Sequence, residues 1–252
     1  MCGIVGHVAC QASQRSRQVV LDGLSRLEYR GYDSAGIALA SPGKLNVIKA
    51  VGKLVNLREA VDQDAPADAF AGIGHTRWAT HGRPTVANAH PHVSPDGRFA
   101  LVHNGIIENA DNLRAQLRAQ GAIFTSETDT EVVVHLLAHA YDQADPASYT
   151  GEVAQLSGTD EAVARRLVVA MREVTAKLEG TFTLLALSTE SPNVIVAARR
   201  SSPLVIGLGE GENFLSSDVL AFIEHTNRAV EIGQDQLVVV SASAVTVIGA
   251  DG

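Results

Sequence analysis

Apolar residues recur at helical spacing in five parts of the chain. In the first of them, Val20, Leu24 and Leu27 fall on one face of a helix, and Gly31 is placed to end it. The same spacing predicts four further helices, around residues 54–61, 113–117, 132–140 and 163–174.

Short runs of apolar and β-branched residues predict strands in most of the remaining chain. Two of them, 34–40 and 45–50, are joined by Pro42-Gly43, which is typical of a tight turn. The others are expected at 4–9, 70–75, 99–102, 182–187, 194–198, 204–208, 214–216, 230–232, 237–240 and 245–248. Strands and helices come in runs, which indicates an α+β fold of antiparallel sheets covered by helices. No repeat or low-complexity linker is visible, so we expect one domain over 1–252.

Composition narrows the class of protein. Of the 252 residues, 46% are hydrophobic and 19% are charged, as in a globular domain with a buried core. The net charge of −8 argues against nucleic acid and anionic membranes as main partners. Cys2 and Cys10 lie too close in sequence to staple a large fold. No apolar run reaches the length of a membrane span and no signal peptide is visible, so we expect a cytoplasmic protein.

Cys2 is the first residue with candidate chemistry. It follows Met1 directly, and its small side chain permits removal of Met1. Cys2 would then carry a thiol and a free α-amino group, whose reference pKa of about 7.7 to 8.0 suits a general base. A cysteine activated by its own amine needs no histidine beside it. The alternative, which the first six residues alone favour, is a buried structural cysteine at the start of a core strand.

Two later stretches carry polar residues after predicted strands. Residues 76–82 read as a loop, in which Arg77 offers a planar fork for a carboxylate. A surface cation–π pair or a structural ion pair is an equal alternative for Arg77 and Trp78. The dipeptide Asn104-Gly105 is typical of a tight turn, but its side-chain amide and backbone N–H could also stabilise an oxyanion.

The segment 128–131 fits a helix capping box, with Thr128 as the N-cap and Glu131 three residues later. The capping box does not account for Asp129 between them. This carboxylate could be solvated or could bind a cation from the first turn of the helix.

Taken together, these stretches resemble a known family, the class II glutamine amidotransferases, which are N-terminal-nucleophile hydrolases. Residues 1–6 are similar to the start of that family. Four further stretches resemble its branch that aminates fructose 6-phosphate: 27–36, 74–82, 88–92 and 103–109. The resemblance covers nearly the whole chain, densely through Glu131 and more loosely after Tyr141. It implies a four-layer α/β/β/α sandwich of two mainly antiparallel sheets.

The resemblance also implies a reaction. Cys2, after loss of Met1, matches the nucleophile that attacks the side-chain amide of L-glutamine, and Asn104 and Gly105 match the oxyanion hole. The products are glutamate and ammonia, by way of a γ-glutamyl thioester. No metal or cofactor is implied. The branch continues into isomerase domains that bind fructose 6-phosphate and are expected to be absent here, and the full-length enzyme is expected to be a homo-oligomer.

Other positions match groups that bind glutamine. Arg77 matches the residue that binds the α-carboxylate, and Asp129 the group that binds the α-amino group. The family loop that closes over glutamine is matched by Trp78, Thr80 and His81. A family histidine near this loop is matched by His90. One departure is Ala110, where relatives carry an aromatic residue, which affects local packing.

Three rival interpretations remain. Other branches of the superfamily are disfavoured by the stretch 29–36. A zinc hydrolase could use the histidines that cluster in sequence, although ordinary hydrogen-bonding histidines are the favoured interpretation. Those histidines are His75, His81, His90, His92 and His103. The third rival is a non-catalytic regulatory or sugar-sensing module.

Overall fold

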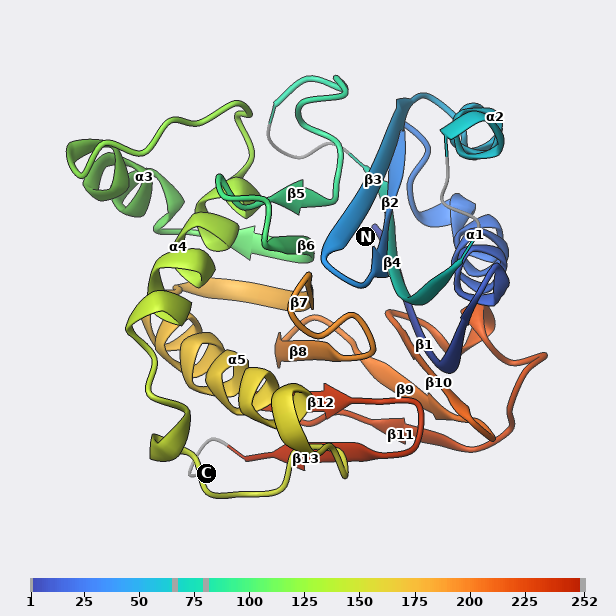
Figure 1. The fold of residues 1–252 in the computed structure, drawn as a ribbon. Helices are drawn as coiled ribbons and strands as arrows, with labels where there is room; N and C mark the ends of the chain where they lie inside the picture. Colours follow the sequence, from blue (N-terminus) through green and yellow to red (C-terminus); the bar gives the residue numbers. More distant parts are fainter. Residues whose placement is uncertain (1, 65–67, 79–81, 250–252) are drawn as a thin grey trace.

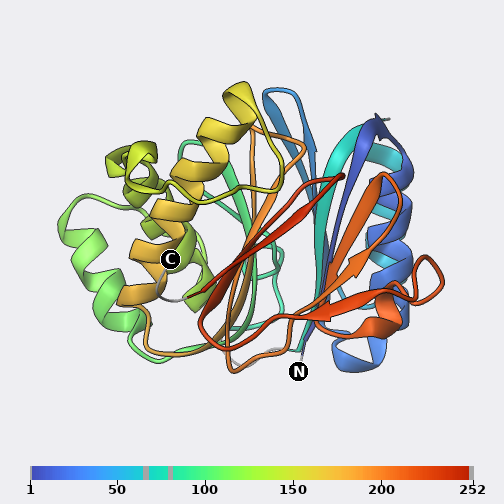
Figure 2. The ribbon, with the colours of Figure 1, turned by 90° about the horizontal axis from the view of Figure 1, so that it is seen from below.

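Two antiparallel β-sheets lie face to face, with helices on both outer faces (Figure 1, Figure 2). The computed structural model describes residues 2–64, 68–78 and 82–249. The strands are β1 (Gly3–Ser13), β2 (Ser34–Ser41), β3 (Lys44–Val51), β4 (Ala69–Arg77), β5 (His92–Val93), β6 (Phe99–Ile107), β7 (Gly180–Ser188), β8 (Ile195–Arg200), β9 (Val205–Leu208), β10 (Glu212–Ser216), β11 (Ala229–Glu231), β12 (Gln236–Val240) and β13 (Val245–Ile248). In the described residues the first sheet has the order β11-β9-β10-β1-β4-β2-β3, and the second has the order β13-β12-β8-β7-β6-β5. The predicted α/β/β/α sandwich is confirmed.

The helices divide between the two outer faces. They are α1 (Arg15–Arg26), α2 (Leu54–Asp64), α3 (Ala110–Ala119), α4 (Asp129–Gln143) and α5 (Gly158–Lys177), with short 3₁₀ turns η1 (Glu28–Arg30), η2 (Pro146–Ser148) and η3 (Val219–Ala221). Apolar residues of α1 and α2 pack on the first sheet, and those of α3, α4 and α5 pack on the second. Across residues 2–64, 68–78 and 82–249, no helix combines the length and apolarity that crossing a membrane requires.

A third apolar cluster fills the space between the sheets. Side chains alternate along each strand, so Ile4 and Val8 of β1 face the other sheet, whereas Val5 faces α1. The sheets approach closely at Gly6, where a Cβ would lie 2.8 Å from Cδ2 of Leu185. Because every second side chain of a strand faces the space between the sheets, the same alternation determines which polar residues lie at the ends of that space.

The structure corrects three boundaries. The first helix ends at Arg26, and η1 follows it, so the helix does not continue to Gly31. The strand β4 runs through Arg77, so the start of the predicted loop 76–82 is strand. The strand β6 continues to Ile107 through Asn104-Gly105, so the tight turn that this dipeptide suggested is not formed.

Candidate active site

A cavity of about 310 Å³ lies at one end of the inter-sheet space. Of the site residues predicted from the sequence, seven line it: Cys2, Arg77, Trp78, His90, Asn104, Gly105 and Asp129. Thr80 and His81 lie outside the described residues. The cavity is also lined by His75, His103, Ile106, Thr128, Thr130, Thr181 and Ser202.

Strand alternation explains why these residues meet. The inward stripe of β1 passes through Ile4 to Cys2, and that of β6 passes through Val102 to Asn104. On β4, His75 and Arg77 continue the stripe of Ile73. The apolar core between the sheets therefore gives way to polar groups at one end, and those groups form the cavity wall.

Cys2 lies directly before β1 and is half-buried. Its Sγ accepts a hydrogen bond from the backbone N–H of Trp78 at 3.1 Å. Burial raises the pKa of the Cys2 thiol, although the Trp78 N–H acts in the opposite direction. The thiol is therefore protonated at neutral pH, and its use as a nucleophile requires a base.

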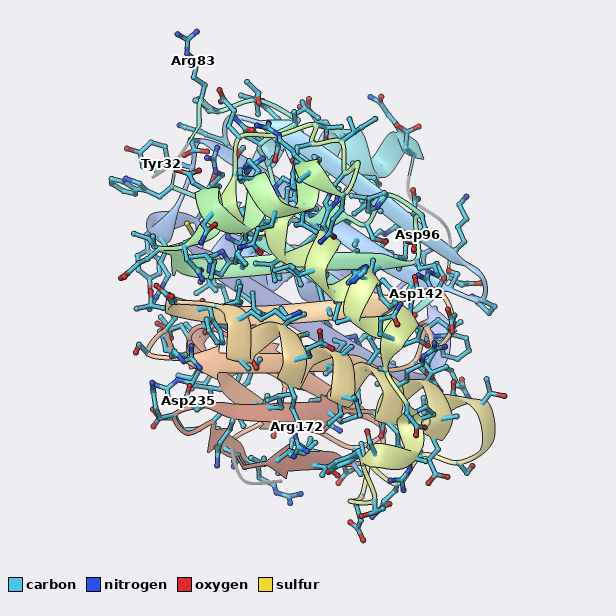
Figure 3. All side chains as sticks on the ribbon, turned by 90° about the vertical axis from the view of Figure 1, so that its left-hand side faces the viewer. Tyr32, Arg83, Asp96, Asp142, Arg172 and Asp235 are labelled. Atoms are coloured by element: carbon cyan, nitrogen blue, oxygen red, sulfur yellow. The ribbon has the colours of Figure 1, made fainter. Side chains whose placement is uncertain are left out.

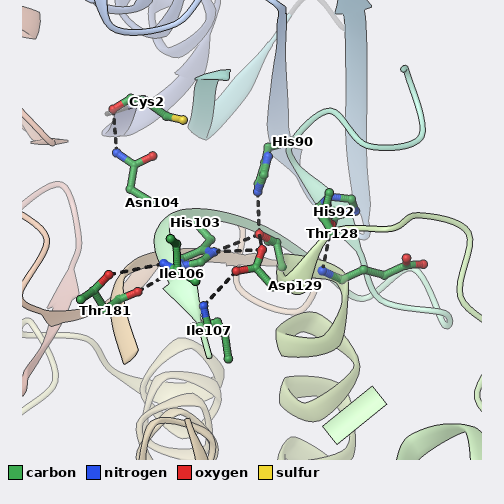
Figure 4. Close-up of polar contacts among 12 residues, drawn as sticks. Cys2, His90, His92, His103, Asn104, Ile106, Ile107, Thr128, Asp129 and Thr181 are labelled. Atoms are coloured by element: carbon green, nitrogen blue, oxygen red, sulfur yellow. Dashed lines mark hydrogen bonds and ion pairs between the residues drawn. The ribbon is translucent and has the colours of Figure 1, made fainter. Parts of the chain in front are cut away.

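Asn104 and Gly105 are held beside Cys2 by the second sheet. The Nδ2 group of Asn104 donates to the carbonyl oxygen of Cys2 at 2.8 Å (Figure 4). Gly105 has a φ of 125°, and a Cβ there would lie 2.0 Å from the carbonyl oxygen of Thr181 on β7. Only glycine fits this position without moving the strand. The strand pairing thus fixes the Asn104 amide next to the backbone of Cys2.

Opposite charges line the same cavity. Arg77 is 4% exposed and donates to the carbonyl oxygens of Gly82 and Arg83 at 3.2 and 3.3 Å. Asp129 is the first residue of α4, and its Oδ2 accepts from the backbone N–H of Ile107 at 2.9 Å. One cation and one anion at a single cavity suit the zwitterionic end of an amino acid. Because Arg77 is buried, the alternative of a surface cation–π pair is wrong, whereas a structural ion pair stays an alternative prediction.

The segment around Asp129 is shaped by its neighbours. Thr128 caps α4 by accepting from the backbone N–H of Glu131, as predicted. The carboxylate of Glu131 does not complete the capping box. It accepts instead from Ser126 and Thr125, through both backbone N–H groups and both hydroxyls, at 2.6 to 2.9 Å. Burial raises the pKa of Glu131, but these hydrogen bonds outweigh burial and hold it below its ordinary value.

Histidines and threonines form a buried polar row in the wall of the cavity and directly behind it (Figure 4). The Oγ1 atom of Thr130 lies 2.7 Å from Nε2 of His90 and 3.0 Å from Nδ1 of His103. Nε2 of His92 lies 2.9 Å from Oγ1 of Thr128. Burial lowers the pKa of all three histidines, so they are neutral at pH 7.

The zinc interpretation finds no support in this row. Among residues 2–64, 68–78 and 82–249, no group of three or more His, Cys, Asp or Glu side chains is arranged to hold a metal ion. The sequence had placed His75 and His103 among the histidines for which ordinary hydrogen bonding was favoured over zinc binding, and it had not singled out Thr130. Strand alternation was the signal that could have found His75, because this residue lies two positions before Arg77.

The site lies at one end of the molecule. In Figure 3, Arg83 points away from the protein at the top of the view, and Tyr32 lies below it at the upper left. Trp78 is 51% exposed, and its ring meets the ring of Tyr32 edge-on at 5.5 Å. The rim of the cavity therefore carries exposed aromatic side chains.

Comparison with known proteins agrees with this geometry. The family described as glutamine amidotransferase domain matches residues 42–146. Among solved structures, the glutamine phosphoribosylpyrophosphate amidotransferase of B. subtilis aligns with a TM-score of 0.73 at 24% identity, over 99% of this chain and 49% of that chain. The allosteric regulatory enzyme of purine biosynthesis aligns with a TM-score of 0.76 at 24% identity, over the same shares of both chains. At this identity the two structures support the fold alone. The chain belongs to the glutamine amidotransferases with an N-terminal-nucleophile fold.

The curated relatives point to one branch of that family. The chain is 53% identical to the glutamine–fructose-6-phosphate aminotransferase [isomerizing] of Streptomyces coelicolor over 252 residues. It is also 53% identical to the enzyme of that name from Leifsonia xyli over 248 residues. These matches cover 100% and 98% of this chain but only 37% and 36% of the relatives. The chain thus spans little more than a third of the relatives' length.

Proposed function

We propose that this chain hydrolyses the side-chain amide of L-glutamine to glutamate and ammonia, with Cys2 as the nucleophile after Met1 has been removed. The observation that carries the proposal is the contact of Asn104 Nδ2 with the Cys2 backbone at 2.8 Å, in a cavity that also holds Arg77 and Asp129. It brings an amide donor, a thiol and a zwitterion-binding pair to one place.

The free α-amino group of Cys2 takes the thiol proton, and the thiolate attacks the amide carbon of glutamine. The negative charge that develops on the amide oxygen is stabilised by Nδ2 of Asn104 and the backbone N–H of Gly105. Ammonia leaves, and the γ-glutamyl thioester on Cys2 remains. Water then cleaves the thioester to release glutamate and restore the thiol.

Arg77 binds the α-carboxylate of glutamine and Asp129 binds its α-amino group, so the side-chain amide points toward Cys2. Trp78, Thr80 and His81 belong to the loop that closes over glutamine. His90 acts from the cavity wall, where it contacts Thr130. These assignments follow the family pattern and the electrostatics of the cavity.

The names of the relatives support a wider proposal. Residues 1–252 form the glutaminase domain of an enzyme that passes ammonia to fructose 6-phosphate, which is bound on further isomerase domains. The proposal extends to a whole enzyme that is a homo-oligomer and works in the cytoplasm.

The test combines mass spectrometry with kinetics. Incubation with 6-diazo-5-oxo-norleucine, a glutamine-like electrophile, should give one adduct on an N-terminal Cys2 from which Met1 is absent. Cys2→Ala should abolish both the adduct and glutamine hydrolysis while its thermal unfolding stays close to that of the parent. Cys10→Ala, which removes the exposed second cysteine, is the control and should keep both. Hydrolysis that survives in Cys2→Ala would refute the proposal.

A further inference from the structure

We propose that His75 is a positioning residue, which fixes the side-chain amide of Asn104 with its N–H groups available to the oxyanion. The proposal rests on the proposed function, because Asn104 matters only if an oxyanion forms beside Cys2. It goes beyond that function by assigning a role to a cavity-lining residue that the proposed reaction does not otherwise use. The contact that carries it joins Nε2 of His75 to Oδ1 of Asn104 at 3.0 Å.

The orientation of the Asn104 amide follows from its two partners. A carbonyl oxygen can only accept a hydrogen bond, so the atom of Asn104 that faces the Cys2 carbonyl is Nδ2. The amide oxygen Oδ1 then faces His75, and because Oδ1 also only accepts, Nε2 of His75 carries the hydrogen. The N–H of His75 therefore holds Oδ1 of Asn104 on its own side and leaves Nδ2 on the side of Cys2.

The state of the His75 ring is consistent with this role. The side chain is 1% exposed, and burial lowers its pKa to about 3, so the ring is neutral with a single N–H. The one N–H of the ring lies on Nε2, because this nitrogen faces Oδ1 of Asn104, which can only accept. The ring also stacks on His90 with the centroids 4.1 Å apart, which restricts its rotation.

His75 is better placed than Cys2 to hold the amide through a reaction. It lies in β4, where it pairs with Ile4 of β1 on one side and Gly36 of β2 on the other. Cys2, the other partner of the amide, is the residue that becomes acylated. When Cys2 shifts to attack or to release glutamate, the contact with His75 keeps Oδ1 turned away from the substrate and leaves Nδ2 facing it.

Loss of the His75 N–H would leave Oδ1 of Asn104 unpaired at a site where Asn104 is 5% exposed. The amide could then rotate by half a turn and present its oxygen to the developing negative charge. Removing an oxyanion donor outright typically costs about 10²- to 10³-fold in kcat. Misorientation of the donor should cost less, roughly 10- to 100-fold, and KM should change little because Arg77 and Asp129 are untouched.

The test is a double-mutant cycle in the chain with Met1 removed, measured as glutamine hydrolysis. His75→Phe should lower kcat by roughly 10- to 100-fold with KM within about twofold. In the Asn104→Ala background the same substitution should change kcat by less than about twofold, because no amide remains to be positioned. His75→Gln, which can place an N–H near the position of Nε2, should recover most of the lost rate.

His92→Phe is the matched control, since it alters a buried histidine of the same row that contacts Thr128 and not Asn104. The change in kcat that His92→Phe causes should be the same with Asn104 present and in the Asn104→Ala background. If His75→Phe does not fold, His75→Asn gives the same cycle, because its shorter amide cannot reach Oδ1 of Asn104. An equal loss of kcat in both backgrounds would overturn the proposal, as would an unchanged kcat in His75→Phe. A parent chain without Cys2-dependent hydrolysis would instead refute the proposed function.

Discussion

The buried histidines beside the cavity predict that moderate acid destabilises the fold. His75, His90, His92 and His103 are 1 to 6% exposed, and burial lowers the pKa of each. In the unfolded chain each has an ordinary pKa of about 6.5. The unfolded state therefore binds more protons below this pH, and the free energy of unfolding must fall as the pH falls from about 6.5 toward the folded pKa values.

The magnitude follows from proton linkage. At pH 5.5, protonation of one histidine stabilises the unfolded chain by about 1.4 kcal/mol. The folded chain is not stabilised by a histidine that stays neutral, so the free energy of unfolding falls by that amount. Three such groups, His75, His90 and His92, remove up to about 4 kcal/mol, a large part of the 5 to 15 kcal/mol that is usual for a folded domain. Most carboxylates titrate at lower pH, so histidines dominate this window.

Urea unfolding, followed by circular dichroism at pH 7.5 and 5.5, measures this loss. His92→Gln removes a histidine that does not line the cavity, so it should shrink the difference between the two pH values by about 1.4 kcal/mol. His139→Gln, at an exposed position, is the matched control. A loss below about 2 kcal/mol for the parent, or an equal loss in His92→Gln, would refute the argument that these rings stay neutral in the fold.

Three further substitutions test the site and its supports. Arg77→Ala should raise KM for glutamine by at least about tenfold, since it removes a charge-assisted contact; an unchanged KM would remove the carboxylate assignment. Gly105→Ala should lower the free energy of unfolding by about 2 to 6 kcal/mol, from the φ of 125° and the clash with Thr181. Glu131→Gln should cost roughly 2 to 4 kcal/mol by weakening its contacts to Thr125 and Ser126. Urea unfolding measures both losses, and a change below about 1 kcal/mol would contradict either.

Periodicity predicted most of the architecture because one face of each element is buried. The hairpin of β2 and β3 was located from its apolar strands and the Pro42-Gly43 turn. The five helices were located from apolar residues that must face a sheet, together with the capping box before α4. The layer order needed the family resemblance, because spacing within an element does not say which sheet it joins. Chemistry at Cys2 likewise stayed ambiguous until other motifs were considered with it.

The errors have a common cause, which is that tertiary contacts override local signals. Asn104-Gly105 has the composition of a turn, but β7 pairs with β6 along both residues and keeps them extended. Glu131 has the spacing of a capping box, but Ser126 and Thr125 offer its carboxylate four donors. No local pattern reports such partners, since they depend on how the preceding loop folds back.

The position of β1 also explains how a nucleophile can work at the end of a chain. Chain termini are poorly ordered unless other elements hold them. Here β1 lies inside its sheet between β10 and β4, and side-chain hydroxyls hold its first residues. Oγ1 of Thr76 accepts from the N–H of Gly3 at 3.2 Å, and Oγ of Ser217 accepts from the N–H of Ile4 at 3.1 Å. A strand at the edge of the sheet would lack one of these neighbours and would let Cys2 drift from Asn104, so the proposed chemistry requires the nucleophile to begin an interior strand.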